Sequence, residues 1–461
     1  MTTPVDCLVI GFAVTGQAAA RELTSRGQRL AVVDDGEPNA TSQRLADRLG
    51  VDLVWGPSRA QLKELARAAG LVVLSPGVPP SHPIFQVADP ERIVAELELA
   101  SSLTTVPVVA VTGTNGKTTV TSLVTSMLSH SGRQAEAVGN IGRPFIEAVG
   151  SHEAEMFVVE VSSFQLAWTR QFRPDVACFL NLAEDHLDWH SSLEEYGAAK
   201  ARIFANQRRD DVAVLNAEDP AVMAWAPSVP GRLVTFGEGG DVTVRDQALV
   251  ARGEEICRVD ELPRSLPHDL SNAAAATAVA LEAGARPEAC AAALRAGVPM
   301  PHRIELVAEI DGVSYYDDSK ATTPSAVLAA LSGFERAVLI AGGRNKGLDL
   351  RAIVRGLAEL AGNKSVPEHV RAVVAIGESA EEVAAAFSEA SVPVVRAASM
   401  GEAVAAAAGL AGPGEAVLLS PGCASFDWYR SYGERGDDFA RVVRSLRPEG
   451  VDSALQQGGV T

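Results

Sequence analysis

Short runs of Val, Ile and Leu alternate with longer amphipathic segments along most of the chain. A short apolar run that ends in a turn residue and is followed by a helical pattern is typical of a β/α unit in a parallel sheet. Nine such runs fall into three groups: 7–11, 30–35 and 71–77, then 107–113, 157–163 and 176–182, then 337–343, 372–377 and 416–422. The pattern predicts an α/β fold with three successive sets of parallel strands.

The length of the chain divides these strands among several domains. A single core stops growing at about 250 to 300 residues, whereas this chain has 461 residues. Pro299 and Pro301 mark a hinge before the third set of strands. We therefore expect three domains, at 1–99, 100–300 and 301–461.

Composition and charge narrow the class of protein. A net charge of −18 argues against function by neutralising nucleic-acid phosphates, which requires clustered Lys and Arg. The N-terminus has no basic region before an apolar stretch, and no uncharged apolar run reaches the length of a membrane-spanning helix. The five cysteines are widely spaced, which favours buried thiols in a reducing compartment. We expect a cytoplasmic protein without membrane insertion.

The sharpest chemical signal is the segment 109–119, VAVTGTNGKTT. A strand ends near Gly113, and Gly116-Lys117-Thr118 opens a helix, so backbone N–H groups and one lysine face the same space. This is typical of a phosphate-binding loop, in which Thr118 also offers a hydroxyl to Mg²⁺. The spacing is two residues shorter than the standard motif.

Acidic and basic side chains follow the neighbouring strands. Glu160 lies near the end of the next apolar run, where ligands bind in an open α/β sheet, and a carboxylate there suits Mg²⁺. The cluster 184–188, EDHLD, follows another strand and includes His186. Lys200 lies in a helical segment beyond it. By residue type alone, the acidic cluster fits a solvated loop equally well, and Lys200 fits a surface lysine.

A second glycine turn follows the first strand. Gly11, Ala13 and Gly16 form a G-x-A-x-x-G pattern, and Asp34 and Asp35 end the second strand. A glycine turn that opens a helix binds phosphate through its free N–H groups. The pattern predicts a diphosphate ligand or a plain structural turn.

Taken together, these motifs resemble those of the Mur ligases, which use ATP to add amino acids to bacterial cell-wall precursors. The matching segments are 113–119, 139–142, 160–166, 185–186, 198–200, 301–303, 318–322, 342–346 and 420–427. The resemblance runs from about residue 8 to residue 445. Within the family, it is greatest to the members that join D-glutamate to UDP-N-acetylmuramoyl-L-alanine.

The resemblance implies a Rossmann-like domain that binds the UDP substrate, a central ATP-binding domain and a C-terminal dinucleotide-fold-like domain for the amino acid. It implies a monomer that binds these three small molecules and two Mg²⁺ ions. In the expected reaction, the muramoyl-alanine carboxylate attacks the γ-phosphate of ATP, and the D-glutamate amine then attacks the acyl phosphate. ATP and D-glutamate bind different domains, so domain closure is expected.

The resemblance also assigns residues to each ligand. For ATP, they are Gly113, Thr114, Asn115, Gly116, Lys117, Thr118, Thr119, Asn272, Arg303 and Asp318. For the UDP substrate, they are Val14, Thr15, Ser75, Pro76, Gly77, Asn140 and His186. For D-glutamate, they are Lys320, Thr322, Lys346, Ser425 and Tyr432. The expected metal ligands are Thr118, Glu160, His186 and a carbamylated Lys200; Lys117, Glu160, His186 and Lys200 form the catalytic group.

The chain departs from the family pattern at four places. Thr323 replaces the Asn that ends the D-S-K-A-T-N motif, and His268-Asp269 stands where H-N is usual. The first turn has Gly11-Phe12-Ala13 instead of G-x-G, and Asp35-Gly36 replaces a frequent Thr-Arg. These changes affect the expected uracil and adenine contacts.

Three alternatives remain from the sequence. Another amino-acid-adding ligase or a folylpolyglutamate synthase shares the phosphate loop. A nicotinamide-dependent oxidoreductase would use the first glycine turn but would leave the phosphate loop unexplained. A nucleotide-gated binding protein without turnover would not need Lys117, Glu160 and Lys200 together.

Overall fold

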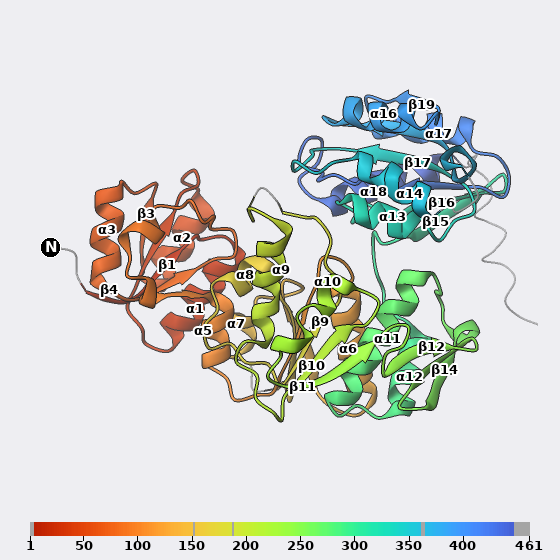
Figure 1. The fold of residues 1–461 in the computed structure, drawn as a ribbon. Coiled ribbons are helices and arrows are strands. Elements are labelled where there is room, and N and C mark those ends of the chain that lie inside the picture. The colour runs from red at the N-terminus through yellow and green to blue at the C-terminus, as the bar shows by residue number, and fades with distance from the viewer. Residues whose placement is uncertain (1–3, 151–152, 187–188, 361–364, 447–461) are drawn as a thin grey trace, which may run out of the picture. The chain divides into compact units, whose positions relative to one another are not determined.

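The computed structural model describes residues 4–150, 153–186, 189–360 and 365–446 (Figure 1). Its contacts divide the chain into two compact units. The first comprises Met1–Leu182, Trp189–Ser265 and Asp269–Val298, and the second comprises Ala183–Asp188, Leu266–His268 and Pro299–Thr461. The main division falls at the expected hinge near Pro299, while the exact boundaries of the three domains stay a prediction.

The first unit begins with a five-stranded parallel sheet in the order β3-β2-β1-β4-β5. Its strands are β1 (Val5–Ile10), β2 (Leu30–Asp34), β3 (Asp52–Trp55), β4 (Ala69–Leu74) and β5 (Ile93–Ala95). The helices are α1 (Val14–Ser25), α2 (Ala40–Leu49), α3 (Arg59–Ala68) and α4 (Ile84–Val87). Local sequence sets their ends: Ser58 and Gln61 form a capping box on α3, and Gly50 ends α2 in the left-handed conformation.

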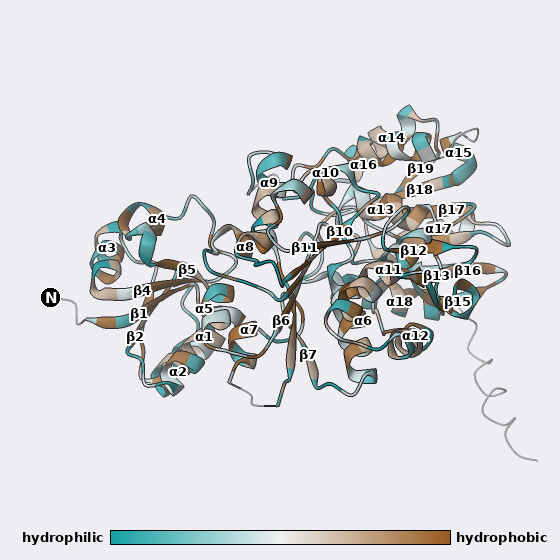
Figure 2. Cartoon of the chain, turned by 60° about the horizontal axis from the view of Figure 1, so that its bottom comes forward, coloured by the Kyte–Doolittle hydropathy of each residue, from teal (hydrophilic) through white to brown (hydrophobic). Residues whose placement is uncertain are grey.

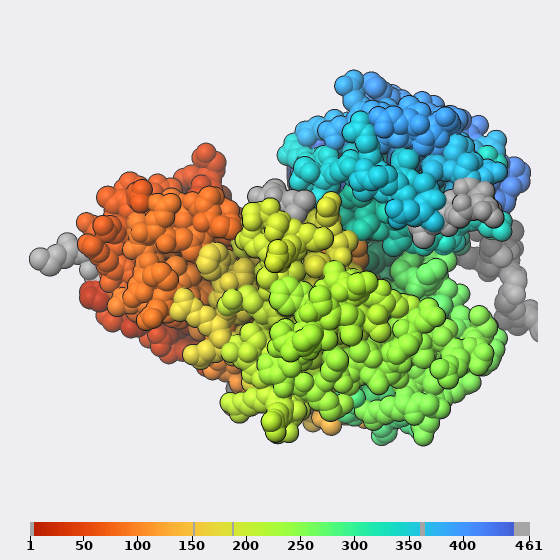
Figure 3. Space-filling view, viewed as in Figure 1, coloured from red at the N-terminus to blue at the C-terminus, as the bar shows by residue number. Residues whose placement is uncertain are grey.

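Helix α5 (Glu96–Ser102) leads from this sheet into the next one. Its Glu98 side chain accepts hydrogen bonds from three consecutive backbone N–H groups, those of Arg170, Gln171 and Phe172. Phe85 stacks on Trp168 with ring centroids 4.2 Å apart. In Figure 3 the orange and yellow surfaces, from these two parts of the chain, touch each other. Apolar stacking and carboxylate–amide bonds therefore join the first two sheets within one unit.

The second sheet has nine strands in the order β14-β13-β12-β11-β10-β9-β6-β8-β7. They are β6 (Val108–Thr112), β7 (Ala135–Gly139), β8 (Met156–Glu160), β9 (Val176–Phe179), β10 (Val212–Asn216), β11 (Arg232–Phe236), β12 (Val242–Arg245), β13 (Ala248–Ala251) and β14 (Glu254–Arg258). The helices are α6 (Lys117–His130), α7 (Phe145–Ala148), α8 (Ser163–Ala167), α9 (Leu193–Ala201), α10 (Pro220–Met223), α11 (Pro267–Glu282) and α12 (Pro287–Ala296). Figure 2 shows β6 and β10 as strongly hydrophobic strands, and all of their residues are buried. From β7 to β12 neighbouring strands of this sheet pair in parallel, and β13 and β14 add antiparallel strands at one end. Buried residues on both faces are usual for parallel strands that are covered by helices.

The second unit contains a six-stranded sheet in the order β15-β16-β20-β17-β18-β19. Its strands are β15 (Glu305–Ile310), β16 (Val313–Asp317), β17 (Ala337–Gly342), β18 (Val370–Ile376), β19 (Val394–Arg396) and β20 (Ala416–Leu419). The helices are α13 (Pro324–Leu331), α14 (Arg351–Leu360), α15 (Val366–His369), α16 (Ala380–Glu389), α17 (Met400–Leu410) and α18 (Tyr432–Ser445). Among the described strands of this sheet, only β15 runs antiparallel to its neighbour. The prediction of an α/β fold with three sheets is confirmed.

The five cysteines are all free and buried. Burial raises the pKa of each thiol above its ordinary value. They pack as small apolar side chains, as their spacing predicted. Among the described residues, no helix has the length and apolarity required to cross a membrane.

Candidate active site

The phosphate-binding loop lies between β6 and α6. Gly116, at the amino end of α6, has a φ of 83°, and Gly113 has a φ of 153°. A Cβ on Gly116 would lie only 2.4 Å from Oδ1 of Asn272. Both glycines therefore permit a backbone that other residues would strain. The loop also brings Asn272 of α11 next to the expected ATP residues.

A residue that the motif search missed supports this loop. Asn181 follows β9, which pairs directly with β6. Its backbone carbonyl accepts from the N–H of Thr114 at 3.0 Å, and its side-chain oxygen accepts from the N–H of Asn115 at 2.8 Å. Its amide nitrogen donates to the carbonyl of Asn115 at 3.1 Å. A prediction that β9 pairs with β6 would have identified Asn181, because the residue after β9 then lies next to the loop after β6.

Two lysines meet at one carbonyl of the loop. Lys117 Nζ donates to the carbonyl oxygens of Gly113 at 2.8 Å and Thr114 at 2.9 Å. Lys200 Nζ, from α9, donates to the same Gly113 oxygen at 2.8 Å. Lys200 is 1% exposed and lies over the ring of Tyr196, with Nζ 4.3 Å from its centroid. The surface-lysine interpretation of Lys200 is therefore wrong.

Glu160 ends β8, which pairs with β6 on the side opposite to β9. It is 2% exposed. Its Oε1 accepts from Nδ2 of Asn140 at 2.8 Å, while Oε2 is buried and has no hydrogen-bond partner among the described residues. A buried carboxylate oxygen that lacks a partner is costly unless a cation completes it. This arrangement fits a hard, oxygen-seeking ion such as Mg²⁺.

The loop residues Thr118 and Thr119 form the first turn of α6 after Lys117. The strand order β7-β8-β6-β9 places Asn140, Glu160, the phosphate loop and Asn181 at successive carboxyl ends. Such an edge is where open α/β sheets bind ligands. The structure thus brings together the expected residues of the first unit for ATP and metal.

The first glycine turn is built for close packing. Gly11 has a φ of 86°, and Ser75 Oγ donates to its carbonyl at 2.9 Å. A Cβ on Gly16 would lie 1.8 Å from that same carbonyl. The N–H of Phe12 donates to Oδ2 of Asp34 at 2.5 Å. The Asp34 carboxylate therefore fixes this turn through a hydrogen bond. In an NAD-binding fold, an acidic residue at this place binds the ribose instead.

The remaining residues expected to bind the UDP substrate lie around this turn. Val14, 71% exposed, and the half-buried Thr15 begin α1. Pro76 and Gly77 follow Ser75 beyond β4. The turn after β4 and the first turn of α1 are therefore joined through the Ser75–Gly11 bond.

The residues expected for D-glutamate cluster at one edge of the third sheet. Lys320 and Thr322 follow β16, Lys346 follows β17 and Ser425 follows β20, and these three strands are adjacent. Nζ of Lys320 lies 5.5 Å from the ring centroid of Tyr432, the first residue of α18. The loops are also joined by the backbones of Arg344 and Ala424, with N–O distances of 2.9 and 3.0 Å.

Asp318 and Arg303, expected on the ATP side, lie in this same unit. Burial raises the pKa of Asp318 to about 7, although the hydrogen bond from Ser420 and the positive charge of Arg303 both lower it. Ser420 Oγ donates to Asp318 Oδ2 at 2.7 Å. The relation of both residues to the phosphate loop stays a prediction.

His186 belongs to a segment that groups with the second unit. Its backbone has a φ of 55°, and its N–H donates to Oδ1 of Asp185 at 2.9 Å. Leu187 and Asp188 of the predicted cluster lie outside the described residues. The expected metal and substrate contacts of His186 stay predictions.

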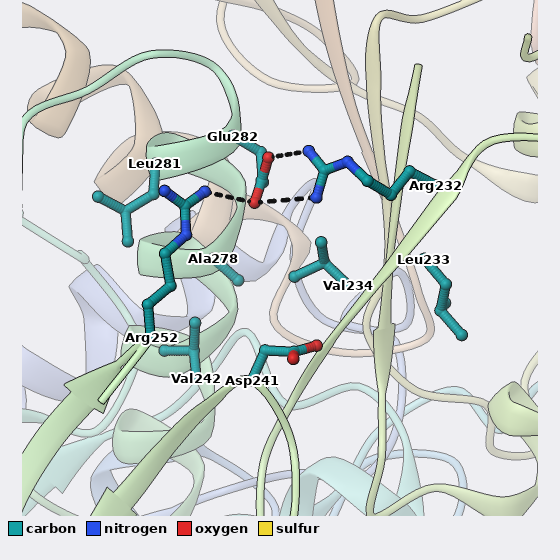
Figure 4. A pocket seen from close by; sticks show the side chains of 9 residues that line it. All are labelled: Arg232, Leu233, Val234, Asp241, Val242, Arg252, Ala278, Leu281 and Glu282. Atoms are coloured by element: carbon teal, nitrogen blue, oxygen red, sulfur yellow. Dashed lines mark hydrogen bonds and ion pairs between the residues drawn. The ribbon is translucent and has the colours of Figure 1, made fainter. Parts of the chain in front are cut away.

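A small cleft of about 130 Å³ is lined mainly by residues of β11, β12 and α11 (Figure 4). Glu282 stands between Arg232 and Arg252 and accepts hydrogen bonds from both guanidinium groups. Burial raises the pKa of Glu282, but these two arginines hold it below its ordinary value. Glu282 ends α11, about 15 Å along the helix from Asn272. The cleft is therefore separate from the phosphate loop.

Three family models match the chain. They describe a Mur ligase MurD-like N-terminal domain over residues 5–94, a Mur ligase middle domain over 111–280 and a Mur ligase glutamate ligase domain over 302–423. Each matched segment contains one of the three sheets or most of it. The models therefore agree with the order of domains that the sequence predicts.

Known proteins match over nearly the full length. UDP-N-acetylmuramoylalanine–D-glutamate ligases from Desulfosudis oleivorans and Frankia casuarinae are each 42% identical over 95% of this chain and over 96% and 93% of their own lengths. The solved structure of UDP-N-acetylmuramate-alanine ligase MurC from Thermotoga maritima covers 96% of this chain and 100% of its own, with a TM-score of 0.59 and 18% identity. A pseudomurein peptide ligase type C from Methanothermus fervidus has a TM-score of 0.60 at 17% identity, covering 96% of this chain and 100% of its own. The fold, the phosphate loop and these full-length similarities show that the chain belongs to the Mur ligase family.

Proposed function

We propose that the chain joins D-glutamate to UDP-N-acetylmuramoyl-L-alanine with cleavage of ATP to ADP and phosphate. The observation that carries this substrate assignment is the 42% identity to D-glutamate ligases over 95% of the chain. The convergence of Lys117, Lys200 and Glu160 at the end of β6 supports the ATP-dependent chemistry. We also propose that the protein is a cytoplasmic monomer, which its composition and the family resemblance lead us to expect.

The reaction needs an activated acyl group, because a carboxylate and an amine do not condense in water. The muramoyl-alanine carboxylate attacks the γ-phosphate and forms an acyl phosphate, with ADP as the leaving group. The D-glutamate amine then attacks the acyl carbon, phosphate leaves and the amine loses a proton. The first attack brings two anions together, so positive charge at the γ-phosphate lowers its barrier.

The residues of the first unit fit this demand. Lys117 releases its two carbonyl partners to contact the β- and γ-phosphates, while the N–H groups of the loop face the anion. Thr118, Glu160 and Lys200 of this unit would hold Mg²⁺, which would neutralise phosphate charge when bound. The unpartnered Oε2 of Glu160 supports this assignment.

Lys200 would serve as a carbamate. An ammonium beside Mg²⁺ would be repelled, whereas a carbamate offers oxygen ligands. Carbamate formation requires the neutral amine, and bound Mg²⁺ nearby would favour that form over the ammonium.

The test is the dependence of phosphate release on both other substrates. We expect release from ATP and Mg²⁺ only when UDP-N-acetylmuramoyl-L-alanine and D-glutamate are both present, and no release by the folded Lys117→Met variant. Phosphate release in the absence of either substrate would contradict the ligase function. A protein that binds ATP but never releases phosphate would instead be a nucleotide-gated binding protein.

A further inference from the structure

Arg435 is a buried side chain at the point where three loops of the second unit meet. It lies on α18 and is 1% exposed. Its Nε donates to Oγ of Ser319 at 2.9 Å, and its Nη2 donates to the backbone carbonyl of Ser319 at 2.8 Å. Its Nη1 donates to the carbonyl of Cys423 at 3.1 Å. A Cβ on Gly343 would lie 3.1 Å from Nη1, so the third loop also packs on the guanidinium.

The hydrogen-bond acceptors of this guanidinium are neutral. Burial lowers the pKa of Arg435 to about 10, so the side chain stays protonated at neutral pH. In the described part of the chain, no carboxylate forms an ion pair with it, and Asp427 and Asp317 act only as charges at longer range. A buried cation without a hydrogen-bonded anion costs free energy that an apolar side chain would avoid. The guanidinium therefore needs a role beyond packing.

The partners of Arg435 stand next to the residues expected to bind D-glutamate. Ser319 precedes Lys320, and its Oγ also donates to the backbone carbonyl of Tyr432 at 2.7 Å. Cys423 lies two residues before Ser425. One planar side chain thus fixes the distance between the loop after β16, the loop after β20 and the first turn of α18.

We propose that Arg435 is a positioning residue for D-glutamate. The planar fork of N–H groups on its guanidinium holds Lys320, Ser425 and Tyr432 at the spacing that the amino acid requires. The inference rests on the proposed function, because it takes these three side chains as the amino-acid site. Arg435 acts through the two loops and does not touch the substrate. Its positive charge also favours an anionic ligand at this edge of the sheet.

The fork distinguishes arginine from lysine at this position. An ammonium carries the same charge, but it cannot present three N–H groups in one plane to Ser319 and Cys423. The Arg435→Lys variant therefore keeps the charge and loses the fixed spacing. Arg441→Lys is the matched control, because Arg441 lies on the same helix, is 71% exposed and pairs with Asp438.

The experiment measures KM for each of the three substrates, with kcat, in the full-length enzyme. For Arg435→Lys, we expect KM for D-glutamate to rise at least about tenfold. KM for ATP and for the UDP substrate should stay within about twofold, and kcat at saturating D-glutamate within a few fold. Arg441→Lys should leave all of these values unchanged.

A D-glutamate KM that stays within twofold, or an equal rise for all three substrates, would overturn the inference. If circular dichroism shows that Arg435→Lys does not fold, Ser319→Ala decides instead. That variant removes one bond to Arg435 and the bond to Tyr432, so we expect a smaller but selective rise in the D-glutamate KM. The wild-type enzyme tests the proposed function separately: failure to use D-glutamate at all would reject that function, not the role of Arg435 in loop spacing.

Discussion

At the scale of single residues, the meeting of two lysines at the Gly113 carbonyl distinguishes this site from a plain phosphate loop. Lys117 belongs to the loop, whereas Lys200 arrives from α9, 87 positions further along the chain than Gly113. Because both amines share one acceptor, a change at either alters the surroundings of the other. Their chemistry should therefore be tested on each lysine separately.

Lys200→Ala should abolish acyl-phosphate formation if Lys200 works as a carbamate. Added formate should then restore part of the activity, because its oxygens replace the missing ligand to Mg²⁺. The measurement is ATP turnover of the variant in tens of millimolar formate. Sodium chloride at the same ionic strength is the control. A fully active variant, or an unmodified amine in the active enzyme by mass spectrometry, would exclude the carbamate.

At the scale of elements, α6 has a glycine with positive φ at each end. Gly116 has a φ of 83° and Gly132 a φ of 85°, but only a Cβ at Gly116 would meet another group, Oδ1 of Asn272 at 2.4 Å. At Gly132 nothing lies within 4 Å of the added atom. The two positions therefore separate backbone strain from the packing of the phosphate loop.

Gly132→Ala should lower stability by about 1 kcal/mol, through the left-handed backbone alone, and leave ATP binding unchanged. Gly116→Ala should lower stability by at least as much and raise KM for ATP at least about tenfold, because the loop must move away from Asn272. Denaturant unfolding and ATP titration of both variants measure the two effects. Equal KM values for ATP in the two variants would show that the loop tolerates the displacement.

The fold and the phosphate loop could be predicted from the sequence because both depend on local patterns. Apolar runs predict strands, and Gly116-Lys117 predicts the start of a helix that binds phosphate. Asn181 and Arg435 could not be predicted in this way. Asn181 acts through the pairing of β9 with β6, and Arg435 acts through contacts with Ser319 and Cys423 that arise only when the third sheet has formed. The burial of Lys200 could not be predicted either, because its neighbours in the sequence are small and polar residues.

At the scale of the whole molecule, the link between the first two sheets of the first unit contains a buried acid. Glu96 is 2% exposed and accepts one hydrogen bond, from the backbone N–H of Ile146 at 2.6 Å. Burial raises its pKa from 4.5 to about 7, although the bond from Ile146 lowers it. The folded protein thus binds the proton of Glu96 more tightly than the unfolded chain does.

This preference predicts a loss of stability as pH rises. Because the pKa of Glu96 is higher in the folded state, protonation of Glu96 stabilises the folded state fully below about pH 4.5. This contribution is lost as the pH rises through about 7. Glu96→Gln, which cannot ionise, should lack this decrease and gain on the order of 3 kcal/mol relative to wild type between pH 5 and pH 8. Urea midpoints at both pH values measure it, with the exposed Glu91→Gln as control. Parallel pH profiles for wild type and Glu96→Gln would show that Glu96 is already ionised in the folded protein.

This Mur ligase is proposed to add D-glutamate to UDP-N-acetylmuramoyl-L-alanine. The most direct measurement incubates the purified protein with ATP, Mg²⁺, UDP-N-acetylmuramoyl-L-alanine and one amino acid at a time, chosen from D-glutamate, L-glutamate, L-alanine and glycine, and determines the product mass. We expect a product that is heavier than the substrate by one glutamate residue, and only with the D-enantiomer, because the relatives at 42% identity are D-glutamate ligases. Equal turnover of L-glutamate, or a product with L-alanine or glycine instead, would contradict it.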